Sequence, residues 1–408
     1  MEEQLLSAVE IGDKSSLKAI LNQQPELINI VFDEHNKTVF ELALENGFLD
    51  IAKELVHNTH FHLNHSEHNP LRLSIDLGYL DIAEALLKKG ANPNYRPKQM
   101  SSALLLCLEN EYFDLAELMI KCGAEVNIRN STGWTPLIWA SIKGRVKAVD
   151  FLLKHGASVS ICNNDGWNAV TGAFFKQRTE VVSMLFKAGA VFSAKFSEAA
   201  LILAYKNGQR DIVLQLLDDG VNPDVENEEG EPLVIMAIGK GDVEIIEALI
   251  TAGANTNARN RASLTALALL AENGLNKCIK LFIENGADVN LKSKKGRTAI
   301  YQAVLYNQVD TIELLYQNGA SVDLRTDEGW SPLMIAASDG YLESVTKLLE
   351  LGANTEFETE KGLTAQNIAK SNAPKHGDFQ KVKGRLVYPM LESSYKQIVE
   401  LLQGVRQQ

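Results

Sequence analysis

The sequence predicts an all-α fold, a solenoid of stacked helix-turn-helix units with projecting β-hairpin-like fingers. The first observation is a Gly-Ala pair that recurs along the 408-residue chain every 33 residues, with one interval of 31. Self-similarity at a fixed period of this length is typical of repeat architectures. The second observation is that apolar residues within a period lie three and four apart, as on one face of a helix. The pairs begin at Gly90, Gly123, Gly156, Gly189, Gly253, Gly286, Gly319 and Gly352, and Gly220 precedes a valine at the vacant position.

Two further sets of glycines share this period and predict the remaining turns. One set is expected between the two helices of a unit and the other where each finger returns, because glycine accepts backbone conformations that other residues resist. With the first set they account for 23 of the 28 glycines. The two sets are Gly12, Gly47, Gly78, Gly144, Gly208, Gly241, Gly274 and Gly340, and Gly133, Gly166, Gly230, Gly296, Gly329 and Gly362.

Residues 131–163 show how one unit is predicted to fold. Thr135 is expected to cap a first helix, with Pro136 in its first turn, where a missing N–H does no harm. That helix should run through Lys143 and end at Gly144. A second helix follows, and its apolar side chains form a single stripe: Val146, Val149, Phe151, Leu152 and Leu153. The unit therefore reads as helix, turn, helix and finger.

The opening and closing residues of the units resemble those of ankyrin repeats. The opening T-P-L is present as Thr135-Pro136-Leu137, and related forms occur in other units. The closing G-A-x-V-N is present at residues 123–127 and 286–290. Twelve units are in phase when counted from the threonine-like position: Glu3, Thr38, Asn69, Ser102, Thr135, Asn168, Ala199, Pro232, Thr265, Thr298, Ser331 and Thr364.

The resemblance implies one gently curved ankyrin-repeat array over residues 1–408. We expect an N-terminal capping repeat at 1–33, ten internal repeats at 34–358, and a C-terminal capping repeat at 359–408 with an insertion at about 371–392. Twelve units stacked at helix-packing distances would extend roughly 100 Å. The insertion is interpreted as an elaborated cap, and an interaction loop is the alternative. The fingers and first helices should line the concave side, which suits binding of another macromolecule.

Composition narrows the classes of protein. The chain has 45% hydrophobic and 23% charged residues, which is ordinary for a folded domain. The net charge of −12 argues against nucleic-acid binding. No apolar run is long enough for a membrane span. The four cysteines form no CxxC pair, which favours reduced thiols in the cytoplasm, and Cys107 is expected in the core.

Motifs for catalysis are missing from the sequence. It contains no phosphate-binding loop, no dinucleotide fingerprint, no nucleophile elbow and no HExxH metal motif. We therefore expect no enzyme activity and no cofactor. A histidine-rich finger offers the weakest alternative, an enzyme or metal protein in which imidazoles would hold Zn²⁺. The candidate ligands are His60, His62, His65 and His68, and a solvated finger is the favoured interpretation.

Aromatic residues are candidates for partner contacts. Trp134, Trp167 and Trp330 each precede the threonine-like residue, a site that faces the groove in the resembled family. Trp134 and Trp167 belong to adjacent units and could form one platform with Phe175 and Phe196. The alternative is that a bulky residue here covers the base of the finger. The fourth tryptophan, Trp139, is assigned to the core.

Charge alternates along the predicted fingers. A patterned groove can steer a complementary partner, although such runs are usually only solvated faces. The candidates for partner contacts are acidic Glu228, Glu229 and Glu231, together with basic Arg261, Lys294, Lys295 and Arg297.

These observations predict a noncatalytic adaptor or scaffold that binds a protein partner on its concave finger and first-helix surface. We expect a monomeric cytoplasmic protein with no nucleic-acid or membrane partner. The alternatives are a regulatory or inhibitory subunit and a bacterial-type effector delivered to a host cell. Fold alone does not choose among these functions.

Overall fold

A computed structural model describes residues 1–32, 36–64, 69–95, 102–373, 381–382, 385–386 and 390–405. These residues hold 24 α-helices, one short 3₁₀-helix and two two-stranded sheets. The predicted all-α helical repeat is therefore confirmed. The chain divides into two compact units, Met1–Ala200 and Leu201–Gln408, and each is described by itself.

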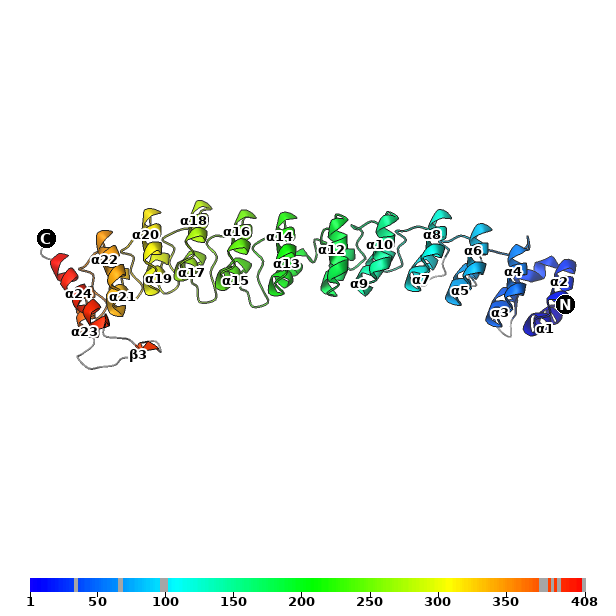
Figure 1. Cartoon of the computed structure of the whole chain (residues 1–408), viewed down its shortest axis with the longest axis horizontal. Helices are drawn as coiled ribbons and strands as arrows, with labels where there is room; N and C mark the ends of the chain where they lie inside the picture. Colours follow the sequence, from blue (N-terminus) through cyan, green and yellow to red (C-terminus); the bar gives the residue numbers. More distant parts are fainter. Residues whose placement is uncertain are drawn as a thin grey trace. The chain divides into compact units, whose positions relative to one another are not determined.

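The first unit consists of helix pairs in which a first helix is followed by a second (Figure 1). The pairs are α1 (Glu2–Ile11) with α2 (Lys14–Gln23), α3 (Val39–Glu45) with α4 (Leu49–His57), α5 (Pro70–Asp76) with α6 (Leu80–Lys88), α7 (Ala103–Glu109) with α8 (Phe113–Lys121), α9 (Pro136–Lys143) with α10 (Val146–Lys154), and α11 (Ala169–Phe175) with α12 (Thr179–Lys187). After α2 come η1 (Pro25–Asn29) and the antiparallel strands β1 (Val31–Phe32) and β2 (Lys37–Thr38).

The second unit repeats this arrangement. Its helices are α14 (Arg210–Asp218), α15 (Leu233–Lys240), α16 (Val243–Thr251), α17 (Ala266–Glu272), α18 (Asn276–Glu284), α19 (Ala299–Leu305), α20 (Val309–Gln317), α21 (Pro332–Asp339), α22 (Leu342–Glu350), α23 (Ala365–Asn372) and α24 (Met390–Val405). The division between the units falls inside α13 (Ser197–Lys206). Strands β3 (Lys381–Val382) and β4 (Arg385–Leu386) pair between α23 and α24.

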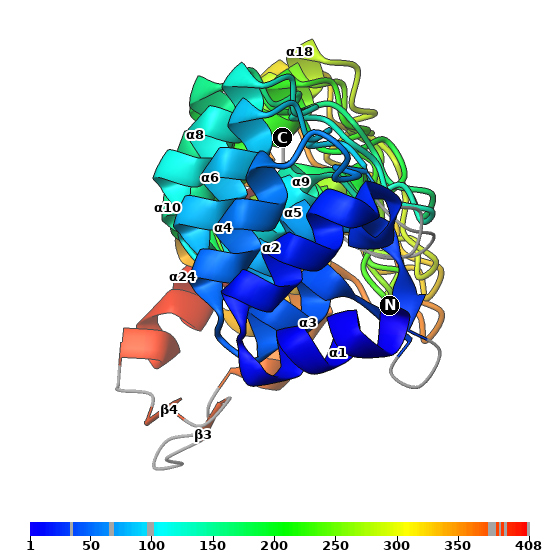
Figure 2. The same ribbon diagram turned by 90° about the vertical axis from the view of Figure 1, so that its right-hand side faces the viewer.

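Each unit has two layers of helices. In the first unit, the second helices α4, α6, α8 and α10 lie in one layer and the first helices α3, α5 and α9 lie in the other (Figure 2). The second unit shows the same two layers (Figure 1). The core lies between the layers, because each helix buries an apolar stripe that no single repeat could cover. Phe40 and Phe282 are among the largest fully buried side chains.

Polar side chains fix where the first helices begin. The predicted N-cap Thr135 accepts a hydrogen bond from the Ile138 amide at 3.3 Å, and α9 ends at Gly144 as expected. A cap of this kind satisfies an amide that the helix itself leaves unpaired. The side chains that cap first helices in this way are Thr38, Asn69, Ser102, Thr135, Asn168, Thr265, Thr298, Ser331 and Thr364.

The glycine spacing correctly predicts the turns. All 23 periodic glycines have positive φ, between 65° and 97°. At vacant positions of the same period, other residues adopt this costly conformation. Glu111, Gln177 and Asn307 do so between the paired helices, and Ser263 does so at a finger return.

Asparagine side chains join successive fingers. Asn127 Oδ1 accepts a hydrogen bond from the Ser158 amide at 2.8 Å, and its Nδ2 donates to the Gly156 carbonyl at 3.4 Å. Asn94, Asn257 and Asn290 occupy the same position in their own repeats. Each makes the same two bonds to the repeat that follows it. Each of these four asparagines, at the last position of its repeat's closing motif, therefore aligns its finger with the next.

The last helix covers the end of the second unit. Tyr395, Ile398 and Leu402 of α24 are buried, and the Tyr395 hydroxyl donates to the Ser338 carbonyl at 2.6 Å. Helix α24 packs against α22 and α23. The preceding insertion, expected at about 371–392, lies mostly outside the described residues.

Candidate functional site

Three half-buried aromatic rings meet on the first-helix side of the first unit. The Trp167 ring lies 5.6 Å from Phe175 and 5.1 Å from Phe196, measured between centroids, and Phe175 lies 6.0 Å from Phe196. The interplanar angles are between 49° and 67°, so the rings meet edge to face or tilted. Such pairs each contribute about 0.5–1.5 kcal/mol beyond the area they bury.

Local backbone contacts hold Trp167 in this cluster. Asn163 Oδ1 accepts from the Trp167 amide, and the Asn163 amide donates to the Trp167 carbonyl, both at 2.8 Å. Asn168 caps α11 and also donates to the Val191 carbonyl at 2.8 Å. These bonds fasten the finger before α11, and the one after it, to the start of that helix.

The single 31-residue interval explains why Phe196 joins the cluster. Helix α13 starts at Ser197, before the threonine-like Ala199, so the finger that precedes it is short. Its Ser193 amide donates to Thr171 Oγ1 at 3.2 Å. Phe196 is thereby placed beside Trp167.

A glycine on α11 brings the neighbouring helix close to the rings. A Cβ atom added to Gly172 would lie 2.5 Å from Ile142 Cγ1 and 3.7 Å from Trp167 Cε3. Trp139 is three residues before Ile142, on the same face of α9. Its assignment to the core was wrong, since Trp139 is only half-buried. We call Ile142, Trp167, Phe175 and Phe196 the aromatic patch.

The other predicted aromatic residues lie apart from this cluster. Trp134 is half-buried, and its amide donates to Asn130 Oδ1 at 2.8 Å. The ring contacts of Trp167 are with Phe175 and Phe196 and do not include Trp134. Trp330 is also half-buried, and its amide donates to Thr326 Oγ1 at 3.1 Å.

Two of the predicted finger charges pair with each other in the second unit. Arg261 forms an ion pair with the Glu229 carboxylate at 2.9 Å and also donates to the Glu229 carbonyl. Glu228 lies 3.7 Å from Lys206. Glu231 is half-buried, and its amide donates to Asn227 Oδ1 at 2.9 Å. Exposed ion pairs of this kind add at most about 1 kcal/mol each.

Other finger cations tie one finger to the next. Arg259 donates to the Lys292 carbonyl at 2.9 Å, and Lys292 donates to the Arg325 carbonyl at 3.0 Å. The predicted Arg297 guanidinium lies 5.7 Å from the centre of the Tyr301 ring. The two remaining predicted cations, Lys294 and Lys295, are exposed.

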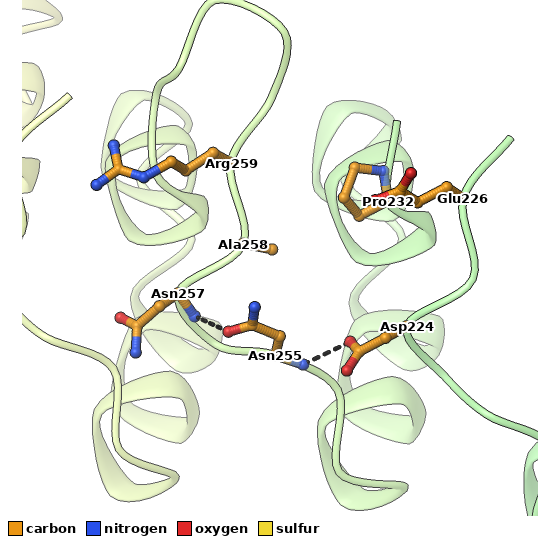
Figure 3. Close-up of a pocket in the computed structure, with 7 residues that line it drawn as sticks. All are labelled: Asp224, Glu226, Pro232, Asn255, Asn257, Ala258 and Arg259. Atoms are coloured by element: carbon orange, nitrogen blue, oxygen red, sulfur yellow. Dashed lines mark hydrogen bonds between the residues drawn. The ribbon is translucent and has the colours of Figure 1, made fainter. Parts of the chain in front are cut away.

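A cleft between two fingers of the second unit is lined by polar groups (Figure 3). Asp224 accepts from the Asn255 amide at 2.7 Å, and Asn255 Oδ1 accepts from the Asn257 amide at 2.9 Å. Arg259 is held by the carbonyls of Ser263 and Lys292. The polar groups of this cleft therefore already stabilise the fingers.

The histidine finger is only partly described. His60 and His62 are exposed, and Asn29 holds their backbones, donating to the His60 carbonyl and accepting from the His62 amide, both at 2.7 Å. His65 and His68 lie outside the described residues. Within the described ranges, no three His, Cys, Asp or Glu side chains are grouped to hold a metal ion.

Burial raises the pKa of two side chains in the first unit. Burial raises the pKa of the Cys107 thiol to about 12, so this cysteine is an inert part of the core, as expected. Burial also raises the pKa of Glu109, on the helix before the aromatic patch. Over the part of the chain that the structure describes, no helix has both the length and the apolar character to cross a membrane.

In a comparison with protein families, the chain matches the family model described as ankyrin repeats (3 copies). The model spans three repeats, and it matches four segments of the chain. The matched segments are 5–97, 104–196, 201–293 and 267–359, which together cover most of the chain. The chain therefore belongs to the ankyrin-repeat family, whose members are in general noncatalytic modules for protein–protein interaction. A search of curated proteins found no match.

Two residues in the region of the aromatic patch were not predicted from the sequence. Ile142 carries no signal of its own, because isoleucine in a helix is ordinary core material. Gly172 did carry a signal, since it lies outside the periodic glycine sets. A glycine inside a helix costs stability relative to alanine, so it indicates a packing or functional requirement.

Proposed function

We propose that this chain is a noncatalytic adaptor or scaffold that binds a protein partner through its fingers and first helices. The observation that carries the proposal is the aromatic patch on the first-helix side. Large aromatic side chains are good anchors, because they bury much apolar area at little entropic cost. The three rings are half-buried, so each keeps exposed apolar surface for a partner.

The absence of catalysis is part of this proposal. Many polar finger groups are used within the fold: the asparagines align successive fingers, and Arg259 and Lys292 bind neighbouring carbonyls. The side chains that remain exposed bind the partner by complementary shape and charge, and no chemical step is involved. We also propose a monomeric cytoplasmic protein that needs no cofactor.

The proposed organisation is one array over residues 1–408, with capping repeats at 1–33 and 359–408. We propose that the partner contacts the residues that the sequence indicated: Trp134, Trp167, Phe175, Phe196, Glu228, Glu229, Glu231, Arg261, Lys294, Lys295, Arg297 and Trp330.

Site-specific photo-crosslinking tests the proposed surface. Benzoylphenylalanine replaces Trp167 or Trp330, two half-buried aromatic positions that tolerate a large ring. We expect both to crosslink to the same partner protein in an extract of the source cells. Matched controls carry the probe at Lys187 or Lys280, exposed positions on second helices. Equal crosslinking at these control positions would contradict a binding surface on the first-helix side.

A further inference from the structure

The segment that holds the aromatic patch is basic in an acidic protein. Residues 129–198 contain nine Lys and Arg and four Asp and Glu, a net charge of +5 in a chain of −12. The basic residues are Arg129, Lys143, Arg145, Lys147, Lys154, Lys176, Arg178, Lys187 and Lys195, and the acidic ones are Asp150, Asp165, Glu180 and Glu198. The sign of this segment therefore opposes that of the whole molecule.

Two of these cations contact residues of the patch, and two more adjoin it along the chain. Lys143 and Lys176 are exposed and follow Ile142 and Phe175 at the ends of their helices. Lys195 Nζ lies 5.4 Å from the centre of the Phe196 ring and donates to the Asp165 carbonyl at 2.8 Å. The fourth, Arg178, donates from Nε to the Ile142 carbonyl at 3.2 Å.

Three acidic residues lie in the same region. The charge of Lys143 acts on Glu109 of α7, and Asp165 and Glu198 each lie two residues along the chain from Trp167 and Phe196, respectively. Lys143, Lys176 and Lys195 are all exposed, so each keeps donors for a second group. The border of the patch is therefore basic overall.

The apolar part of the patch fits a side chain better than a nucleobase. A base stacks on a flat ring face. Here the three rings meet at 49° to 67° and cover one another in part. The three rings are only half-buried, so an apolar side chain can lie against the part of each ring that stays exposed.

We propose that the aromatic patch binds an acidic segment of a partner protein, with a large apolar side chain against the Trp167, Phe175 and Phe196 rings and carboxylates paired to Lys143, Lys176 and Lys195. The proposal rests on the proposed function and adds the chemistry of the partner. The aromatic rings supply the buried anchor, and the surrounding lysines select the sign of the segment.

A peptide titration tests this chemistry on the full chain. The probe is a fluorescein-labelled 12-residue peptide with four glutamates around one phenylalanine and one leucine, and binding is followed by fluorescence anisotropy. Two matched peptides replace the glutamates by lysine or the two apolar residues by serine. We expect the acidic apolar peptide to bind at least about tenfold more tightly than either.

Two charge-reversed variants locate the binding. Lys143→Glu, Lys176→Glu and Lys195→Glu together should weaken the peptide about tenfold, because three attractive charges become repulsive. The matched variant reverses Lys147, Lys154 and Lys187, which lie on second helices, and should change affinity less than twofold. Thermal unfolding of both variants verifies that they fold. Phe196→Ser should weaken the peptide without changing its dependence on salt.

Four results would overturn the proposal. The lysine peptide binding as tightly, or the second-helix variant weakening the peptide equally, would show that the patch does not select acidic segments. Tighter binding of a 12-residue oligo-dT with steep salt dependence would make the patch a nucleic-acid surface. No binding of any peptide, alongside crosslinks at Trp330, would leave the proposed function standing and this inference wrong.

Discussion

At the scale of single residues, backbone conformation connects the sequence with the fold. The periodic glycines between paired helices take the left-handed region because the turn between two antiparallel helices requires positive φ. At Gln177 the same turn, between α11 and α12, has φ of 57° without glycine. A side chain in this region costs about 1–2 kcal/mol, partly offset by the smaller loss of backbone entropy compared with glycine.

Replacing Gln177 by glycine is therefore expected to stabilise the protein by about 1 kcal/mol. The reverse substitution Gly208→Gln is the matched control, because an added Cβ there meets nothing within 4 Å and only φ is strained. It should destabilise by a similar amount. The urea midpoint measures both changes, and two unchanged midpoints would show that the turn tolerates any residue.

At the scale of elements, one hydrogen bond fastens the terminal helix to the repeats before it. The Tyr395 hydroxyl of α24 donates to the Ser338 carbonyl. Burial, together with the nearby Asp339 and Tyr341, raises the pKa of Tyr395 to about 12. The folded protein thus favours the protonated phenol. The stability that the Tyr395 phenol contributes is fully present below a pH of about 10, its pKa in the unfolded chain. This stability is lost as the pH rises through about 12.

Tyr395→Phe should lower the free energy of unfolding by about 1 kcal/mol at pH 7, since the Ser338 carbonyl loses its donor. The difference from the unmodified chain should shrink as the pH rises above 10, because the Tyr395 phenol then ionises in the unfolded chain while it stays protonated in the folded one. Urea unfolding from pH 7 to 11 follows both proteins. A difference that stays constant over this range would mean that the bond does not titrate with Tyr395.

At the scale of the whole molecule, each repeat is stabilised by contacts with its immediate neighbours. The extensive helix contacts within each unit join the two helices of a pair or the helices of adjacent pairs. In such an array, stability is nearly a sum of repeat and neighbour terms. A defect in one repeat should therefore weaken its neighbours and leave distant repeats intact.

Phe282→Ala tests this expectation. Phe282 on α18 is fully buried, and its truncation should cost about 3–5 kcal/mol. Hydrogen exchange measured by mass spectrometry should accelerate in α15 to α20 and remain unchanged in α3 to α6. Lys280→Ala, an exposed change on the same helix, is the control. Equal acceleration in all helices would mean that the chain unfolds as one cooperative block.

The sequence alone determined the period, the helix pairs, the caps and the turns, because each depends on a few neighbouring residues and recurs. Thr135 as a cap and Gly144 as a turn follow from local backbone chemistry. Only the tertiary structure decided which side chains meet. Trp167 contacts Phe196 because one short finger brings it there, and Arg261 pairs with Glu229 across two fingers. Such contacts depend on how repeats are stacked, which the spacing along a single repeat does not specify.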